Sequence, residues 1–382
     1  MTHLNRQAFL TLQGLGAGND NLVKQAILVM IGFGLVDYVG DPSLWTNVAS
    51  GLFIIPFLLL SGVAGRWVAV KDLRHVIITI KNLEVLCALM AAAGLVLGSL
   101  TLLLLSLAGL GAQSTLFGPS KFSWPARTES IEALPSVTGS IEAITFMAIL
   151  LGSLIGGLMV SIPIALAGLI VSLALIGRWL AGRLPSVPAP STELASYHDH
   201  PQAIKARRLI SWFWFLGASY LTQLPLLTRE IMQWPAESVS YALAAFAIGV
   251  GVGSKATRHI GTASLPAGYV GLIALGLILP FCAQLSGWMG LLALAGLGVA
   301  GGLYVVPLYV WMQQHLPVSD LPQAIGRNNR LNAILMIASA GFAIVTLVQL
   351  GLTPEQYFVT LALCSVLIAP WVKGFATDYS GS

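Results

Sequence analysis

The sequence predicts an all-α integral membrane protein with twelve transmembrane helices in two pseudo-symmetric six-helix halves. Of its 382 residues, 56% are hydrophobic and only 9% are charged, whereas soluble domains carry roughly 25% charged residues. Apolar stretches long enough to cross a bilayer recur along the chain, and basic residues fall in alternate connections between them. So few charges cannot cover a core with a solvated surface, which excludes a soluble enzyme, a disordered protein and a nucleic-acid binder.

The individual helices are delimited by stretches that lack Asp, Glu, Lys, Arg and His. A bilayer core of about 30 Å requires roughly 20 apolar residues per helix. The charge-free stretch 42–65 holds one such helix, whereas 143–177 and 260–314 each hold two, broken near Pro163 and near 284–288. The predicted spans are 9–37, 43–65, 74–95, 98–118, 138–160, 161–181, 207–230, 238–257, 266–285, 288–312, 323–349 and 355–373.

The basic residues support an even number of spans. Sixteen of the 19 lysines and arginines lie in alternate connections or at the adjoining helix ends, which places them on one side of the membrane. By the positive-inside rule this side is the cytoplasm, and both chain termini lie in it. Arg229 alone lies on the opposite side, while Lys24 and Lys81 lie inside predicted helices.

A polar, proline-rich segment divides the chain into a six-helix half at 1–182, a cytoplasmic linker at 183–206 and a second six-helix half at 207–382. The two halves share faint internal repeats: residues 15–17 resemble 216–218, and 147–151 resemble 332–336. Parallel six-helix repeats about an axis along the membrane normal are typical of major facilitator transporters.

Several charged residues fall where lipid should surround the chain. A charge near the bilayer centre costs about 2.5–3.5 kcal/mol, so it needs a partner or a purpose. Asp20 and Lys24 are four residues apart, and Lys81 and Glu84 three apart, so each pair shares a helix face. For Asp20 and Lys24, the structural alternative is that they lie at the frayed end of a helix that starts near Leu22. For Lys81 and Glu84, the structural alternative is a self-neutralising pair that holds helices together.

Further polar residues lie near predicted helix ends. Glu142 opens the span 138–160, where it is a candidate either for a functional carboxylate or for a helix N-terminal charge favoured by the macrodipole. The small residues at 152–157 favour close helix approach. Gly118-Pro119 is expected to end a helix and leave Lys121 on the cytoplasmic side. In the later span 323–349, Asn328 and Asn332 share one helix face. No nucleophile–base pair, metal-ligand set or phosphate-binding loop accompanies them, so we expect no catalytic residue, metal or cofactor.

Five segments resemble the lysophospholipid transporters of the major facilitator superfamily. The Asn-Asp-Asn block at 19–21 and the Gly-Pro-Ser-Lys block at 118–121 carry the resemblance most specifically. The resemblance spans nearly the whole chain, and the same membrane module occurs fused ahead of acyltransferase and acyl-carrier-protein ligase domains. The five segments are 16–22, 118–122, 142–157, 301–308 and 328–335.

This resemblance implies a multi-pass flippase of the bacterial inner membrane. It would move lysophosphatidylethanolamine-type lipids to the cytoplasmic leaflet by alternating access, for re-acylation by a separate cytoplasmic acyltransferase or acyl-ACP synthetase. Asp20 and Lys121 would form a charged lock in the first half. Stand-alone members tend to carry an Arg and a Glu where this chain has Gln223 and Asn332, so a second lock would be hydrogen-bonded. The loop 64–67 also lacks the Asp usual in the superfamily's signature loop.

The expected partners are therefore a lysophospholipid substrate and membrane lipids, with no nucleic acid. A proton-coupled exporter of drugs or other small amphiphiles is the alternative, with Asp20 or Glu142 as proton carrier, although 152–157 lacks the proline usual in such antiporters. A lipid-presenting scaffold that does not transport is a second alternative. The predicted intramembrane charge pair is Lys81 with Glu84, and the predicted substrate-binding and translocation residues are Asp20, Asn21, Lys24, Lys121, Glu142, Gln223, Asn329 and Asn332.

Overall fold

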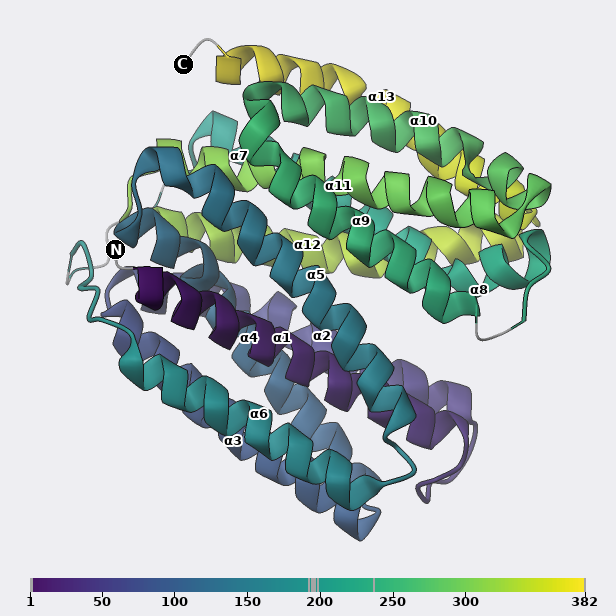
Figure 1. The fold of residues 1–382 in the computed structure, drawn as a ribbon, viewed down its shortest axis with the longest axis horizontal. Coiled ribbons are helices and arrows are strands. Elements are labelled where there is room, and N and C mark those ends of the chain that lie inside the picture. Colours follow the sequence, from purple (N-terminus) through teal and green to yellow (C-terminus); the bar gives the residue numbers. More distant parts are fainter. Residues whose placement is uncertain (1–2, 192, 194–196, 198, 236–237, 381–382) are drawn as a thin grey trace. The chain divides into compact units, whose positions relative to one another are not determined.

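A computed structural model describes residues 3–191, 193, 197, 199–235 and 238–380, and this described part contains helices and no strand (Figure 1). Twelve of its helices have 21 residues or more, which agrees with the predicted all-α fold. The long helices of the first half are α1 (His3–Gly32), α2 (Pro42–Ala69), α3 (Leu73–Leu97), α4 (Leu100–Thr128), α5 (Leu134–Leu158) and α6 (Pro163–Arg183).

The second half contains the other six long helices and several short helical segments. α7 ends at Thr222 and is followed by the single turn α8 (Leu224–Leu226) and the π-helix η2 (Leu227–Ile231). The 3₁₀ turns η1 (Ile131–Ala133) and η3 (Gly261–Ala263) precede α5 and α10, and the π-helix η4 (Ile344–Gln349) follows α12. The long helices are α7 (Pro201–Thr222), α9 (Ser238–Ile260), α10 (Ser264–Leu285), α11 (Gly287–His315), α12 (Leu321–Ala343) and α13 (Pro354–Ser380).

Judged by length and composition, ten helices of the described chain could cross a membrane. The two long helices outside this set are α1 and α7, both of which carry many polar residues in their first half. The predicted boundaries differ at several ends: α1 ends at Gly32 rather than at 37, and α7 begins at Pro201 rather than at 207.

One predicted helix end is wrong. Gly118-Pro119 does not end a helix, because α4 continues through Pro119 and Pro125 to Thr128. Proline removes one backbone hydrogen bond, but transmembrane helices tolerate this loss where neighbouring groups satisfy the freed carbonyl. Lys121 therefore lies within a helix rather than in a loop after one.

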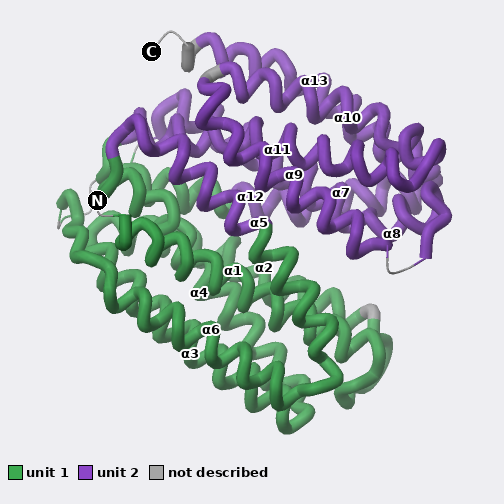
Figure 2. The backbone as a smooth tube through the Cα atoms, in the orientation of Figure 1, with its two compact units in different colours: residues 1–129, 147–197, 317–330 green, residues 130–146, 198–316, 331–382 purple. Residues whose placement is uncertain are grey.

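The chain forms two compact units (Figure 2). Unit 1 comprises residues 1–129, 147–197 and 317–330, and unit 2 comprises 130–146, 198–316 and 331–382. These units do not follow the predicted halves residue for residue, since α5 and α12 each contribute residues to both.

Unit 1 is held together by apolar packing and by close approach of helix backbones. Aliphatic side chains of α1, α3, α4 and α6 form a continuous buried core. Gly152 and Gly156 of α5 lie against the backbone carbonyls of Gly18 and Leu22 on α1, where any Cβ would clash. The small residues of the segment 152–157 therefore serve helix packing, as predicted from the sequence.

In unit 2, α11 packs against both α9 and α10, and α10 packs against α13. The first part of α5 also belongs to this unit, and the Thr138 hydroxyl donates a hydrogen bond of 2.6 Å to the Gln313 Oε1 of α11. Phe146 of α5 stacks on Trp214 of α7, with ring centroids 6.2 Å apart.

Candidate functional site

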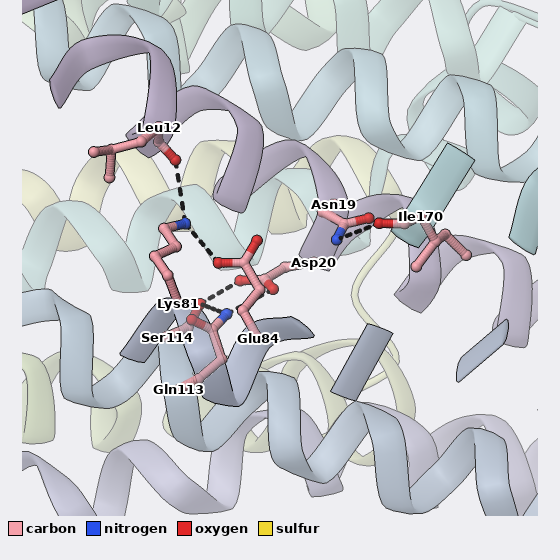
Figure 3. A network of polar contacts seen from close by, with 8 residues as sticks. All are labelled: Leu12, Asn19, Asp20, Lys81, Glu84, Gln113, Ser114 and Ile170. Carbon is pink, nitrogen blue, oxygen red and sulfur yellow. Dashed lines mark hydrogen bonds and ion pairs between the residues drawn. The ribbon is translucent and has the colours of Figure 1, made fainter. Parts of the chain in front are cut away.

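Unit 1 encloses a group of polar side chains in its apolar interior, here called the buried polar cluster: Asp20, Lys81, Glu84, Gln113 and Ser114 (Figure 3). The residues come from α1, α3 and α4, so the cluster joins three helices. Ser114 is half-buried and the other four are buried. The cost of placing such groups in a membrane interior is lowered when they are hydrogen-bonded to one another.

The centre of the cluster is an ion pair on α3. The Lys81 Nζ lies 2.5 Å from the Glu84 Oε2, and the two side chains are 3% and 0% exposed. Lys81 also donates a hydrogen bond of 3.2 Å to the backbone carbonyl of Leu12 on α1, and its ammonium group lies 5.6 Å from the ring centroid of Phe117. Lys81 and Glu84 therefore contact each other directly, and the hydrogen bond from Lys81 to Leu12 ties α3 to α1.

Gly16 makes room for the lysine side chain. A Cβ at this position of α1 would lie 2.6 Å from the Lys81 Nζ and 3.5 Å from the Glu84 Oε2. A distance of 2.6 Å is too short for a non-bonded contact, so a larger residue at position 16 would require the Lys81 ammonium group to move.

Asp20 binds two polar side chains of α4. The Gln113 Nε2 donates to the Asp20 Oδ1 at 2.9 Å, and the Ser114 hydroxyl donates to the Asp20 Oδ2. Asp20 also lies within electrostatic reach of Lys81 and Glu84. With both carboxylates ionised, the cluster holds two negative charges and one positive charge. The Glu84 Oε1 is buried and accepts no hydrogen bond from the described residues.

The charged residues of the sequence do not point to Gln113 and Ser114 as members of the cluster. The available signal was the run of three polar residues at 113–115, toward the end of the predicted span 98–118. What the sequence could not indicate is their partner, since Gln113 and Asp20 are 93 residues apart along the chain.

The other polar residues of α1 have separate partners. The Asn19 Nδ2 donates to the carbonyl of Ile170 on α6 at 3.2 Å, and the Asn21 Nδ2 donates to the carbonyl of Ala17 in its own helix at 2.8 Å. The Lys24 ammonium lies 5.4 Å from the ring centroid of Phe53 on α2. Since α1 is continuous from His3 through these residues, they do not form a frayed helix end.

Lys121 and Asn329 lie close to the helical turn of α4 that contains Gly118. The Lys121 ammonium is 5.1 Å from the ring centroid of Phe122. The Asn329 side-chain amide occupies the space that a Cβ on Gly118 would need. Ser114, which binds Asp20, is seven residues before Lys121, or about 10 Å along the helix axis. The lock between Asp20 and Lys121 stays a prediction.

The remaining predicted residues belong to unit 2. Glu142 on α5 is 1% exposed. The Asn332 Oδ1 on α12 accepts a hydrogen bond of 2.7 Å from the Ser211 hydroxyl on α7. Gln223 is the residue after the end of α7, twelve residues beyond Ser211 and so about 18 Å further along the helix. The structure therefore pairs Asn332 with Ser211 and does not bring it together with Gln223.

The comparisons with known proteins agree with this architecture. A family model described as the Major Facilitator Superfamily matches residues 22–340. The chain belongs to this superfamily. The fucose:proton symporter of E. coli has the same fold, with a TM-score of 0.78 and 13% identity over 97% of this chain and 98% of the symporter.

Two curated relatives of this superfamily member carry the name "Lysophospholipid transporter LplT". The protein from Photorhabdus laumondii is 25% identical over 89% of this chain and 90% of its own length. The protein from Yersinia pestis (strain Pestoides F) is 28% identical over 80% of this chain and 78% of its own length. The superfamily, the fold and these relatives identify a multi-pass membrane transporter rather than an enzyme.

Proposed function

We propose that the protein is a lysophospholipid flippase of the bacterial inner membrane, with both termini in the cytoplasm. It moves lysophosphatidylethanolamine-type lipids to the cytoplasmic leaflet by alternating access, and a separate cytoplasmic acyltransferase or acyl-ACP synthetase re-acylates them. The relatives named lysophospholipid transporters support this substrate class, since they align with 80% and more of the chain.

The observation that carries the proposal is a buried polar cluster of both charge signs inside an apolar helical unit. A lysophosphatidylethanolamine headgroup contains a phosphate and an ammonium group, and its single acyl chain requires apolar walls. Lys24 and Lys121 offer cations for the phosphate, and Asp20 offers an anion for the ammonium group. We assign Asp20, Asn21, Lys24, Lys121, Glu142, Gln223, Asn329 and Asn332 to substrate binding and translocation.

The Lys81–Glu84 pair has a supporting role in this proposal. The Lys81 ammonium group is held by the Glu84 Oε2, and Lys81 also binds the backbone of α1. The pair therefore positions α1, and with it Asp20, rather than meeting the headgroup directly. Asp20 is the residue on which the function depends most directly.

The deciding experiment is uptake of labelled lysophosphatidylethanolamine into spheroplasts, with and without a proton uncoupler. The proposal expects uptake that survives the uncoupler and is lost in Asp20→Asn. The matched control is Asp37→Asn, the same change at an exposed residue just beyond the end of α1, which should transport normally. Membrane amounts and the elution profile of the purified proteins show whether both variants insert and fold. Full uptake by Asp20→Asn would refute the role of this carboxylate.

A proton-coupled exporter of small amphiphiles is the second candidate. It is favoured by three buried carboxylates, those of Asp20 and Glu84 in unit 1 and that of Glu142 in unit 2. The same assay separates the two functions, because an exporter gives no lysolipid uptake and moves unrelated amphiphiles only while the proton gradient lasts. A lipid-presenting scaffold would give neither activity.

A further inference from the structure

Unit 2 contains a groove that the transport proposal does not use. It lies between α7, α12 and α13 and has a volume of about 280 Å³. This is slightly below the usual range for drug-sized ligands, so the groove can hold part of one acyl chain but not a whole lipid. Its lining residues are Arg208, Leu209, Trp212, Leu331, Leu335, Ile368 and Trp371.

The charge of the groove is concentrated in one side chain. Arg208 is exposed and forms no ion pair with any described residue, whereas its neighbour Arg207 is 3.0 Å from Asp199. Lys373 is also exposed and follows Trp371 by two residues on α13. The lining residues within the described chain include Arg208 and no carboxylate, so the groove attracts anions and offers an ammonium group no opposite charge.

The groove also has the composition of a membrane boundary. Leu331, Leu335 and Ile368 supply aliphatic walls, and Trp212 and Trp371 supply indole rings, of which Trp371 is 56% exposed. Tryptophan is enriched at the headgroup level of membranes, where one part of the ring contacts acyl chains and the other contacts polar groups. Arg208 belongs to the basic residues that the positive-inside rule places on the cytoplasmic side.

We propose that this groove binds an anionic two-chain phospholipid of the cytoplasmic leaflet, such as phosphatidylglycerol. The phosphate contacts Arg208, the glycerol region lies beside the tryptophans, and part of one acyl chain covers the aliphatic residues. Basic pockets between transmembrane helices on the cytoplasmic side are suited to anionic headgroups. The apolar lining favours a lipid over free phosphate, and the lack of a lining carboxylate favours phosphatidylglycerol over an ethanolamine lipid.

The proposal is tested by native mass spectrometry of the full-length protein titrated with phosphatidylglycerol or with phosphatidylcholine of the same acyl chains. The wild type should retain phosphatidylglycerol preferentially. Arg208→Gln should weaken its retention by about fivefold, which matches roughly 1 kcal/mol for one arginine at a membrane surface. Trp371→Ala should weaken retention of phosphatidylglycerol as well, and both variants should fold because their side chains are exposed.

Arg183→Gln is the matched control. Arg183 is also an exposed arginine on the predicted cytoplasmic side, and its guanidinium lies 3.7 Å from the ring centroid of Trp179, but it is outside the groove. Retention should stay at the wild-type level in this variant. Equal losses in Arg183→Gln and Arg208→Gln, no preference over phosphatidylcholine, or displacement of the lipid by inorganic phosphate would each overturn the proposal. Since retention is measured without transport, these results do not depend on the flippase proposal.

Discussion

Lys81 and Glu84, three residues apart on α3, form an ion pair of 2.5 Å whose side chains are 3% and 0% exposed. A buried pair of this kind is costly to desolvate, and removing one partner leaves an uncompensated charge in a medium that solvates it poorly. The pair also reaches α1 through the hydrogen bond from Lys81 to the carbonyl of Leu12.

Lys81→Met should destabilise the protein by about 3–5 kcal/mol, because it leaves the buried Glu84 carboxyl group without its partner. The double variant Lys81→Met/Glu84→Leu should recover much of this loss, because both charges are removed together. Thermal unfolding of the purified proteins in the same detergent measures both effects. A double variant that is less stable than Lys81→Met would contradict this account.

The same double variant separates a structural role from a functional one. If it recovers both stability and lysolipid uptake, the pair serves only to join α3 to α1. If it recovers stability without uptake, the pair takes part in transport.

Gly16→Ala should disturb the cluster through steric contact alone. The added Cβ would lie 2.6 Å from the Lys81 Nζ, so the ammonium group must move away from Glu84 or from Leu12. We expect a loss of about 1–3 kcal/mol, as for other overpacked sites, measured by thermal unfolding. Gly168→Ala on α6 is the control, since a Cβ there meets nothing within 4 Å. Equal stability of the two variants would argue against the close approach of Gly16 and Lys81.

Gln113→Leu should weaken the site around Asp20. The substitution removes the 2.9 Å hydrogen bond to the Asp20 Oδ1, and a typical hydrogen bond contributes about 0.5–1.5 kcal/mol. Lysolipid uptake should fall in parallel, because Asp20 loses the contact that orients it. Ser106→Ala is the control on the same helix, since the Ser106 hydroxyl donates to the Leu103 carbonyl in its own helix and to no other group of the described residues. Normal uptake by Gln113→Leu would show that Asp20 acts without this neighbour.

Asp72, in the connection before α3, should give the protein an acid-sensitive contribution to stability. Burial opposes its charged form, but hydrogen bonds from the Ser186 hydroxyl at 2.6 Å and from backbone N–H groups, including that of His75 at 3.0 Å, outweigh burial and lower the pKa of Asp72. A lowered native pKa means that the contribution is fully present above the ordinary aspartate value of about 3.9 and is lost as the pH falls through the lower native pKa.

Asp72→Asn should therefore be less stable than the wild type at pH 7, and the difference should shrink as the pH falls below about 4. Thermal unfolding across this pH range measures the effect, with the exposed Asp37→Asn as control. A difference that is independent of pH would show that the Asp72 carboxylate is not stabilised in its charged form.

Helix positions followed closely from the sequence, and helix ends less so. All twelve predicted spans correspond to long helices, because each apolar stretch must satisfy its own backbone hydrogen bonds in lipid. The expected stop at Gly118-Pro119 was wrong, since the cost of a proline in a helix depends on the neighbours that compensate for it.

The contacts of the candidate site were likewise predictable from the sequence only in part. The spacing of Lys81 and Glu84 predicted their contact, because residues three apart on a helix share one face. The sequence likewise identified Asp20 as a charge that needs a partner in the membrane. It did not identify Gln113 and Ser114 as the partners, nor Ser211 as the partner of Asn332.

The sequence by itself thus determined which segments are helices, that most of them are apolar enough to cross a membrane, and which polar residues are costly there, because hydropathy and helical periodicity are local properties. Only the tertiary structure decided which polar groups meet. Asp20 and Gln113 are 93 residues apart, and Ser211 and Asn332 are 121 apart. Their contacts depend on the rotation and register of packed helices, which are set by the shapes of all the apolar side chains between them.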